Sequence, residues 1–385
     1  MVASRVNTNP LVMLKEFGQS VWLDYIRRSL ITSGELERLV KDDELRGVTS
    51  NPAIFEKAIT GSSDYSEALK NMDMRKGLDA KARYERLAIK DIQDAADVMR
   101  AVYERTKRRD GYVSLEVSPH LARDTDGTVE EAHRLWKAVG RSNVMMKVPA
   151  TSEGIPAIQQ LISEGINVNV TLLFSQGAYE RVADAYVSGL QKLAARDGDV
   201  NKVASVASFF ISRIDTAIDA LISTRLQAST DQGEQALLRS LMGKVAIANA
   251  KLAYQRYQEI YSNPSWEALA KKGAMTQRVL WASTSTKNPN YRDVLYVEEL
   301  IGPDTVNTIP PATFDAFRDH GRPRASLLEN VEDAHDTMDT LERVGIFMKE
   351  ATDTLLEEAL RLFNEPFDKL LAAVDRQARS SRLSR

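Results

Sequence analysis

The chain has 385 residues, no cysteine and a formal net charge of −3, from 51 Lys and Arg against 54 Asp and Glu. It can therefore form no disulfide, thiolate zinc site or cysteine nucleophile, and its near-neutral balance gives no broad basic surface for nucleic acid. Because no apolar run approaches the roughly 20 residues that span a bilayer, and the N-terminus has no long apolar segment, we expect a cytoplasmic protein without membrane or nucleic-acid partners.

Eight short apolar runs alternate with longer amphipathic stretches along the chain. Strands are predicted at 20–25, 46–50, 112–117, 143–148, 167–174, 202–210, 278–283 and 305–309. Several of these runs are nearly continuous in apolar residues, which is typical of strands buried on both faces. Helical patterns lie between them and include 34–45, 82–106, 129–140, 176–195 and one long stretch at 233–261.

This alternation implies parallel strands joined by crossover helices. Eight such units favour an α/β fold built as a single closed (β/α)8 (TIM) barrel, with a doubly wound open sheet as the alternative. We expect additional helices before the first strand and after Pro311, with 322–385 as a C-terminal helical extension. A helix at 355–375 should be interrupted near Pro366, and the basic end from Arg376 should be a solvated tail. Since no linker is visible, we expect residues 1–385 to form one domain.

In a (β/α)8 barrel, catalytic residues lie where strands end and the following loops begin. Three of the predicted strands carry a single charge near that end, namely Asp24, Glu116 and Lys147. Burying a charge is costly unless it is paired, so these three should offset one another in the barrel mouth. The other polar residues at strand ends are Thr49, Asn51, Asn169, Thr171, Ser208, Ser283 and Thr284.

Lys147 lies in the apolar segment VMMKVPA and has two interpretations. It is either a strand-end lysine whose ammonium group reaches water, or a desolvated amine that attacks a ketone and forms a Schiff base. Carboxylates on other strands favour the second interpretation, because imine chemistry needs proton transfers.

Four segments, taken in order, resemble those of transaldolases: GVTSNPAIF, NVMMKVPATSEGI, INVNVTLLFS and SFFISRID. The resemblance spans about residues 18 to 320, and the chain length resembles that of the longer bacterial members. It implies a pentose phosphate pathway enzyme that moves a dihydroxyacetone unit from sedoheptulose 7-phosphate to glyceraldehyde 3-phosphate. It also implies a lysine Schiff base, no metal or organic cofactor, and sugar phosphates as partners; either a monomer or a homodimer is compatible with it.

The resemblance further implies roles for individual residues. Lys147 would carry the Schiff base, Asp24 would act as acid and base on the donor hydroxyl, and Glu116 with Thr171 would position a catalytic water. The ketose hydroxyls would be hydrogen-bonded by Asn51, Asn169 and Ser208, with Thr49 as a neighbour. The substrate phosphate would be bound by Arg213 and Ser283.

The chain departs from the family pattern after the seventh strand, where it has Ser283-Thr284-Ser285 in place of Ser-x-Arg. Lys287 is a candidate for the missing charge, although it lacks the fork of an arginine; alternatively, it is a solvated loop lysine. Asn51 can also be interpreted as a helix N-cap. Arg213 and Asp215 can also be interpreted as a surface ion pair. The histidines lack HExxH spacing and no phosphate-binding glycine loop is present, so we expect neither a metal nor a nucleotide site.

Two alternatives to a transaldolase stay open. A fructose 6-phosphate aldolase releases free dihydroxyacetone, but those relatives are much shorter and tend to have tyrosine where this chain has Phe210. A non-catalytic barrel that binds sugar phosphates or a protein is disfavoured by the joint presence of Asp24, Glu116, Lys147 and Thr171.

Overall fold

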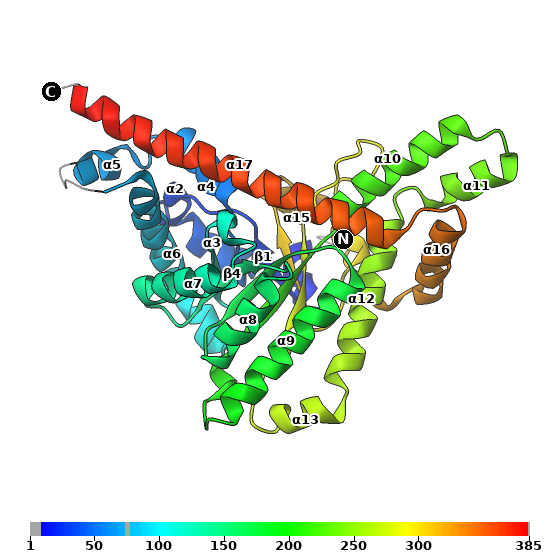
Figure 1. Ribbon diagram of the computed structural model, residues 1–385, viewed down its shortest axis with the longest axis horizontal. Coiled ribbons are helices and arrows are strands. Elements are labelled where there is room, and N and C mark those ends of the chain that lie inside the picture. The colour runs from blue at the N-terminus through cyan, green and yellow to red at the C-terminus, as the bar shows by residue number, and fades with distance from the viewer. Residues whose placement is uncertain (1–8, 74–77, 384–385) are drawn as a thin grey trace, which may run out of the picture.

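The computed structural model describes residues 9–73 and 78–383, without the side chains of residue 73 and of 377–383. Parallel strands form a closed barrel in chain order, and the first strand pairs with the last (Figure 1). The strands are β1 (Gln19–Leu23), β2 (Gly47–Val48), β3 (Tyr112–Glu116), β4 (Val144–Pro149), β5 (Val168–Leu173), β6 (Ser205–Phe210), β7 (Arg278–Ala282) and β8 (Thr305–Ile309). Closure of the sheet confirms the (β/α)8 barrel and excludes the doubly wound open sheet.

The strand residues are buried throughout, as expected when one strand face fills the barrel and the other lies beneath helices. At the amino ends of the strands, a buried charge pair fills the barrel. Nη2 of Arg278 lies 2.8 Å from Oδ1 of Asp110, and Ser20 donates a hydrogen bond to Asp110 at 2.8 Å. Burial alone would raise the pKa of Asp110, but the Arg278 guanidinium holds it below its usual value. The pair therefore stays ionised and paired inside the protein.

Helices connect the strands and surround the barrel (Figure 1). As far as β6, they are α1 (Pro10–Met13), α2 (Arg28–Thr32), α3 (Glu35–Asp42), α4 (Pro52–Thr60), α5 (Ser66–Asp73), α6 (Ala80–Arg105), α7 (Thr125–Val139), α8 (Gly154–Ser163) and α9 (Gln176–Ala194). After β6, they are α10 (Ser212–Ala228), α11 (Gln232–Leu241), α12 (Val245–Tyr261), α13 (Pro264–Ala270), α14 (Leu295–Glu299), α15 (Pro311–His320), α16 (Val331–Arg343) and α17 (Met348–Leu383). Short 3₁₀ helices lie at Leu14–Phe17, Pro119–Leu121, Val200–Lys202 and Ser326–Leu328. None of the described helices combines the length and the apolar character needed to cross a membrane.

The prediction of one helix at 233–261 was wrong, because the structure has two, α11 and α12. The chain turns at Gly243, which has a φ of +69° in the left-handed region that glycine favours. Its backbone N–H donates to Asp219 at 3.1 Å, and a Cβ at this position would come within 2.7 Å of the Tyr291 ring. The glycine therefore both ends α11 and allows close packing against Tyr291.

The predicted interruption near Pro366 was also wrong, since α17 continues through this residue. Proline removes one backbone donor and strains the preceding turn, at a cost of about 3 kcal/mol. The helix persists because its apolar face is buried, with Phe363, Phe367 and Leu370 only 8%, 3% and 0% exposed. The basic end is likewise helical as far as Leu383, while the side chains that follow Arg376 lie outside the described residues.

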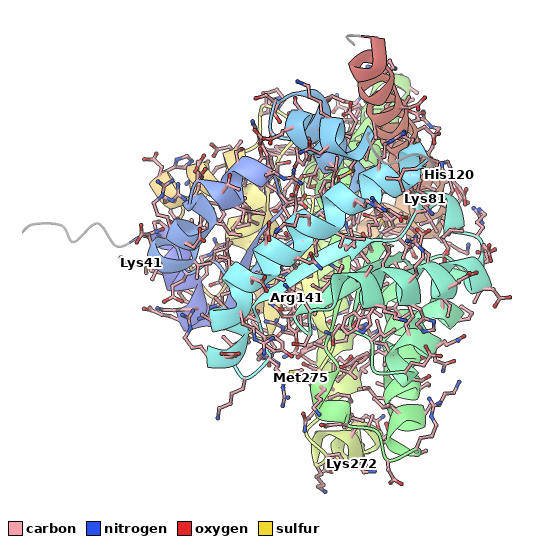
Figure 2. The ribbon with its side chains drawn as sticks, turned by 90° about the vertical axis from the view of Figure 1, so that its left-hand side faces the viewer. Lys41, Lys81, His120, Arg141, Lys272 and Met275 are labelled. Carbon is pink, nitrogen blue, oxygen red and sulfur yellow. The ribbon has the colours of Figure 1, made fainter. Side chains whose placement is uncertain are left out.

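The long helix α17 lies across one end of the barrel, drawn in red in Figure 1. It contacts α4, α5, α6, α10 and the strand β5. Nε2 of His120, a residue labelled in Figure 2, lies 2.8 Å from Asp368 of α17, and Arg123 forms an ion pair with Glu357. These contacts hold the C-terminal helix over the carboxyl ends of the strands.

Candidate active site

A pocket of about 600 Å³ opens at the carboxyl ends of the strands, beneath α17. Most of the predicted site residues line it: Asp24, Thr49, Asn51, Lys147, Thr171, Ser208, Arg213, Ser283 and Lys287. They come from different strands and the loops after them, and the barrel brings them together as the strand-end argument predicted. Glu116 and Asn169 are not among the lining residues and are buried behind the pocket wall.

Lys147 is 5% exposed, so it is buried at the pocket wall and does not extend along the protein surface into bulk water. It pairs in register with Glu116 on the neighbouring strand, which places the two side chains next to each other. Its Nζ lies 3.3 Å from Oε2 of Glu116 and donates a hydrogen bond to the Ser50 carbonyl at 3.1 Å. The amine is thus held by one carboxylate and one backbone oxygen while it faces the pocket.

Both carboxyl groups near Lys147 hold protons more readily than usual. Burial raises the pKa of Glu116 to about 7, although the charge of Lys147 opposes the shift. Burial also raises the pKa of Asp24, against the effects of Lys147 and of a hydrogen bond from Thr49 Oγ1 at 2.7 Å. Carboxyl groups with raised pKa values are suited to give and take protons near neutral pH.

The end of β5 has an unusual backbone that sets the position of Thr171. The register between β5 and β6 shifts between Val170 and Leu173, and Leu172 has a φ of +62°. A left-handed leucine is strained by roughly 1–3 kcal/mol, and such bulges re-aim side chains beside active sites. Among the described residues, Oγ1 of Thr171 is buried without a hydrogen-bond partner. Thr171 therefore has a hydroxyl available for a water or a substrate.

A chain of buried hydrogen bonds runs from Ser208, at the pocket wall, to Asn169 behind it. Ser208 donates to Oδ1 of Asn169 at 2.7 Å, and Asn169 donates to Oγ of Ser114 at 3.0 Å. Asn169 is 0% exposed, whereas Ser208 lines the pocket. Asn169 is thus placed to orient Ser208, and its direct contact with a ketose hydroxyl stays a prediction.

Asn51 is the N-cap of α4, because its Oδ1 accepts a hydrogen bond from the backbone N–H of Ile54 at 3.0 Å. The N-cap interpretation is therefore confirmed. The same residue also lines the pocket, so its amide nitrogen is the group that can reach a substrate.

One end of the pocket is cationic, with Arg213, Lys287 and Lys57 in its lining. Within the described part of the chain, none of the three forms an ion pair. Nζ of Lys287 donates to Ser285 Oγ at 2.6 Å, and its pKa is lowered by partial burial and by the charges of Arg213 and Lys57. Glu358 partly offsets the charge of Arg213, but the two lysines and Arg213 still repel one another, so the group favours an anion such as a phosphate.

The interpretation of Arg213 and Asp215 as a surface ion pair was wrong. Asp215 is 1% exposed and accepts hydrogen bonds from Ala246 N–H at 2.7 Å and Tyr296 Oη at 2.8 Å. Arg213 instead extends over the ring of Phe210, at 5.7 Å from the centroid.

The loop after β7 is held against α10, the helix whose first turn contains Arg213. Tyr291 donates to Asp219 of α10 at 2.6 Å, and Ser212 and Ser283 share a hydroxyl hydrogen bond of 2.9 Å. Ser283 also has a φ of +56°, which turns the chain sharply at the strand end. This arrangement holds the loop that carries Lys287 on the same side of the pocket as Arg213.

Further lining residues were not predicted, and they include Tyr25, Lys57, Thr308, Leu362 and Phe363. Thr308 lies at the end of β8 and bonds Thr49 at 2.6 Å, so the strand-end rule applied to the eighth strand would have found it. Lys57 lies four residues after Ala53, another lining residue on the same face of α4, but no sequence signal placed Ala53 in the pocket. Leu362 and Phe363 reach the pocket only through the packing of α17, which no local pattern predicts.

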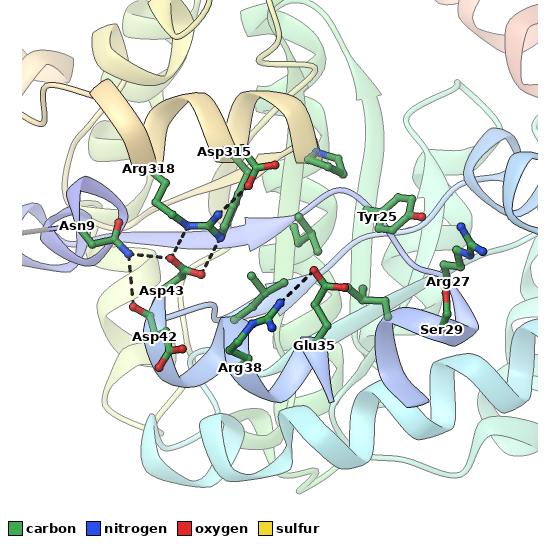
Figure 3. A pocket seen from close by; sticks show the side chains of 15 residues that line it. Asn9, Tyr25, Arg27, Ser29, Glu35, Arg38, Asp42, Asp43, Asp315 and Arg318 are labelled. Carbon is green, nitrogen blue, oxygen red and sulfur yellow. Dashed lines mark hydrogen bonds and ion pairs between the residues drawn. The ribbon is translucent and has the colours of Figure 1, made fainter. Parts of the chain in front are cut away.

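A second hollow, of about 540 Å³, lies on the outside of the barrel between α3 and α15 (Figure 3). Several of its charges are paired with one another, as the dashed lines in Figure 3 show, and Arg27 pairs with Asp64. Arg318 bonds Asp43 at 2.7 Å and Asp315 at 2.7 Å, and Arg38 lies 3.4 Å from Glu35. Because this hollow has no comparable group of unpaired cations and no buried amine, the barrel-mouth pocket is the candidate active site. In the described part of the chain, no group of three or more His, Asp or Glu side chains is arranged to hold a metal ion.

Comparison with known proteins shows the family to which the chain belongs. Residues 21–374 match the family model described as Transaldolase/Fructose-6-phosphate aldolase. The chain is 48% identical over 378 residues to a protein of Trichodesmium erythraeum named Transaldolase, with 97% of this chain and 98% of that protein covered. It is also 48% identical over 373 residues to Transaldolase 2 of Nostoc punctiforme, with 96% and 98% covered. A Transaldolase of Thiobacillus denitrificans is 45% identical over 361 residues, with 94% and 98% covered.

Proposed function

Because the chain belongs to the transaldolase/fructose-6-phosphate aldolase family, we propose that it is a transaldolase that carries a dihydroxyacetone unit on Lys147. The observation that carries this proposal is the buried Lys147 in contact with Glu116, in a pocket whose lining also holds a group of three cations, Arg213, Lys287 and Lys57. A desolvated amine, a proton carrier and a phosphate-binding end are what a Schiff-base reaction on a ketose phosphate requires.

In the first half of the reaction, neutral Nζ of Lys147 attacks C2 of sedoheptulose 7-phosphate. The carbonyl oxygen leaves as water, with proton transfer through Glu116, and a positively charged iminium forms. Asp24 then takes the proton of the C4 hydroxyl, and the C3–C4 bond electrons move into the iminium to give an enamine. Erythrose 4-phosphate leaves with a new aldehyde. No metal or organic cofactor is needed, because the iminium is the electron sink.

In the second half, the enamine attacks the aldehyde carbon of glyceraldehyde 3-phosphate. Asp24 returns its proton to the new hydroxyl oxygen, and water adds to the iminium to release fructose 6-phosphate and free Lys147. In this scheme, Thr171 and Glu116 hold the water. Asn51 and Ser208 bind the ketose hydroxyls, and Asn169 orients Ser208. Each group of residues in the pocket thus has a separate role in this scheme.

Transfer and simple aldol cleavage give different products, so product analysis tests the proposal. With fructose 6-phosphate and erythrose 4-phosphate together, the protein should form sedoheptulose 7-phosphate and glyceraldehyde 3-phosphate. With fructose 6-phosphate alone, little free dihydroxyacetone should accumulate after the first turnover, because the enamine stays bound. Steady release of dihydroxyacetone would support the aldolase, and absence of either reaction would support a non-catalytic binding barrel.

Loss of Arg213 should raise KM for the phosphorylated donor more than loss of either lysine. Arg213→Ala should raise KM for fructose 6-phosphate about 10- to 100-fold, because it removes charged hydrogen bonds worth roughly 1.5–3 kcal/mol. Lys57→Ala and Lys287→Ala should each raise KM about three- to tenfold, with an effect that weakens as salt is added. Steady-state kinetics at low and high salt measure both effects.

The control donor is unphosphorylated fructose, whose transfer the lysine variants should leave unchanged. The control variant is Lys271→Ala, because Lys271 pairs with Glu267 in α13 and does not line the pocket. If Lys57→Ala and Lys287→Ala leave KM for fructose 6-phosphate unchanged, these lysines are solvated bystanders and Arg213 with Ser283 binds the phosphate alone.

We further propose that residues 1–385 form a single domain and that the enzyme acts in the cytoplasm. The continuous apolar core that joins the barrel to α17 supports the first part. Both a monomer and a homodimer are compatible with this proposal.

A further inference from the structure

The ring of Phe363 lies beside the amine of Lys147. Nζ of Lys147 is 5.7 Å from the centroid of this ring, within the range of a cation–π interaction. Phe363 is 8% exposed and lines the candidate active site. It belongs to α17, so the C-terminal helix supplies a wall of the pocket directly at the reactive nitrogen.

We propose that Phe363 is a positioning residue whose π face stabilises the positively charged iminium on Lys147 during the transfer reaction. The inference rests on the proposed Schiff base at this lysine and assigns a positioning role to a residue outside the barrel. The ring acts through Lys147 and needs no contact with the sugar.

The reason for such a partner is that the other groups around Nζ change during the cycle. Glu116 lies 3.3 Å from Nζ and is also the group that moves protons during imine formation, so its charge is neutralised at some steps. Asp24 becomes protonated when it takes the C4 hydroxyl proton. An aromatic quadrupole cannot be protonated, so the Phe363 ring stabilises the iminium whenever it is present, before C3–C4 cleavage and again after the enamine has attacked the second aldehyde.

The same helix carries a second buried phenylalanine, Phe367, which can serve as a control. Phe367 lies one turn further along α17 and is 3% exposed. Its ring packs edge-on against Tyr84 at 5.7 Å and against His120 at 5.8 Å. Phe363 and Phe367 therefore share residue type, helix face and burial, and Phe363 is the one that lies against Lys147.

The decisive experiment replaces Phe363 with mono-, di- and trifluorinated phenylalanine in the full-length protein. Fluorine withdraws charge from the ring face and leaves its shape nearly unchanged. The first half-reaction is measured in single turnover as release of glyceraldehyde 3-phosphate from fructose 6-phosphate, together with the amount of borohydride-trapped adduct. Both should fall stepwise with each fluorine, and Phe363→Leu should lower the rate about two- to thirtyfold.

The same fluorinated series at Phe367 should leave the rate unchanged, and so should Phe367→Leu after correction for folded protein. If fluorination of Phe363 leaves the single-turnover rate unchanged while Phe363→Leu lowers it, the ring contributes only packing and the inference is overturned. If the parent protein forms no adduct at all, the proposed Schiff base fails first, and this outcome is distinct from a flat fluorine series.

Discussion

Lys147→Ala will abolish transfer of the three-carbon unit while the barrel stays folded. We expect the rate to fall at least about 10⁴-fold, because the reaction loses its covalent path and not only an acid–base group. The fold should tolerate the change, since Glu116, which loses its partner, has a pKa of about 7 and can remain protonated in the low-dielectric pocket. Activity assays, circular dichroism and thermal unfolding measure the two parts of this expectation.

The matched control for this variant is a second buried lysine, Lys251, which is also 5% exposed. Its ammonium group donates to the Ser326 carbonyl at 2.9 Å and the Glu329 carbonyl at 2.6 Å, so it ties α12 to the segment before α16. Lys251→Met should lower Tm and retain kcat. A Lys147→Ala protein that keeps substantial transfer activity would show that the carbonyl carbon is bound elsewhere.

Asp24→Asn and Glu116→Gln will block different steps of the same reaction. Asp24→Asn should still form the imine with fructose 6-phosphate but cleave the C3–C4 bond about 10²- to 10⁴-fold more slowly, because no base takes the C4 hydroxyl proton. Glu116→Gln should slow imine formation itself by about 10²-fold or more. The amides keep the size of the side chains, so packing around Lys147 changes little.

Rapid-quench borohydride trapping separates the two defects. The Asp24→Asn protein should accumulate a six-carbon adduct, and the Glu116→Gln protein should accumulate little adduct of either length. Equal trapping defects in both variants would refute the division of labour between the two carboxylates.

The barrel and most of its mouth could be predicted from sequence because the physical signals are local. Strands buried on both faces leave continuous apolar runs, and a lone charge inside such a run is conspicuous. The rule that catalytic groups follow strand ends then placed Asp24, Lys147 and Thr171 in one pocket. The pairing of Lys147 with Glu116 follows from their register on adjacent strands, which the structure supplies.

The errors arose where tertiary packing overrides local preference. Gly243 breaks a helical pattern because the chain must pass close to Tyr291, and Pro366 stays helical because the flanking apolar face is buried. Phe363 was missed for the same reason, since nothing in its local sequence indicates that α17 crosses the barrel mouth. A second cation beside Arg213 was predicted at Lys287, and Lys57 of α4 adds a third to the pocket lining.

The most direct test of a Schiff base on Lys147 is to map the covalent intermediate on the unmodified protein. The protein is incubated with fructose 6-phosphate, reduced with borohydride, digested and analysed by tandem mass spectrometry. A three-carbon adduct is expected on the peptide that contains Lys147 and on no other lysine. An adduct on a different lysine, or no adduct under conditions where transfer proceeds, would contradict the assignment of Lys147.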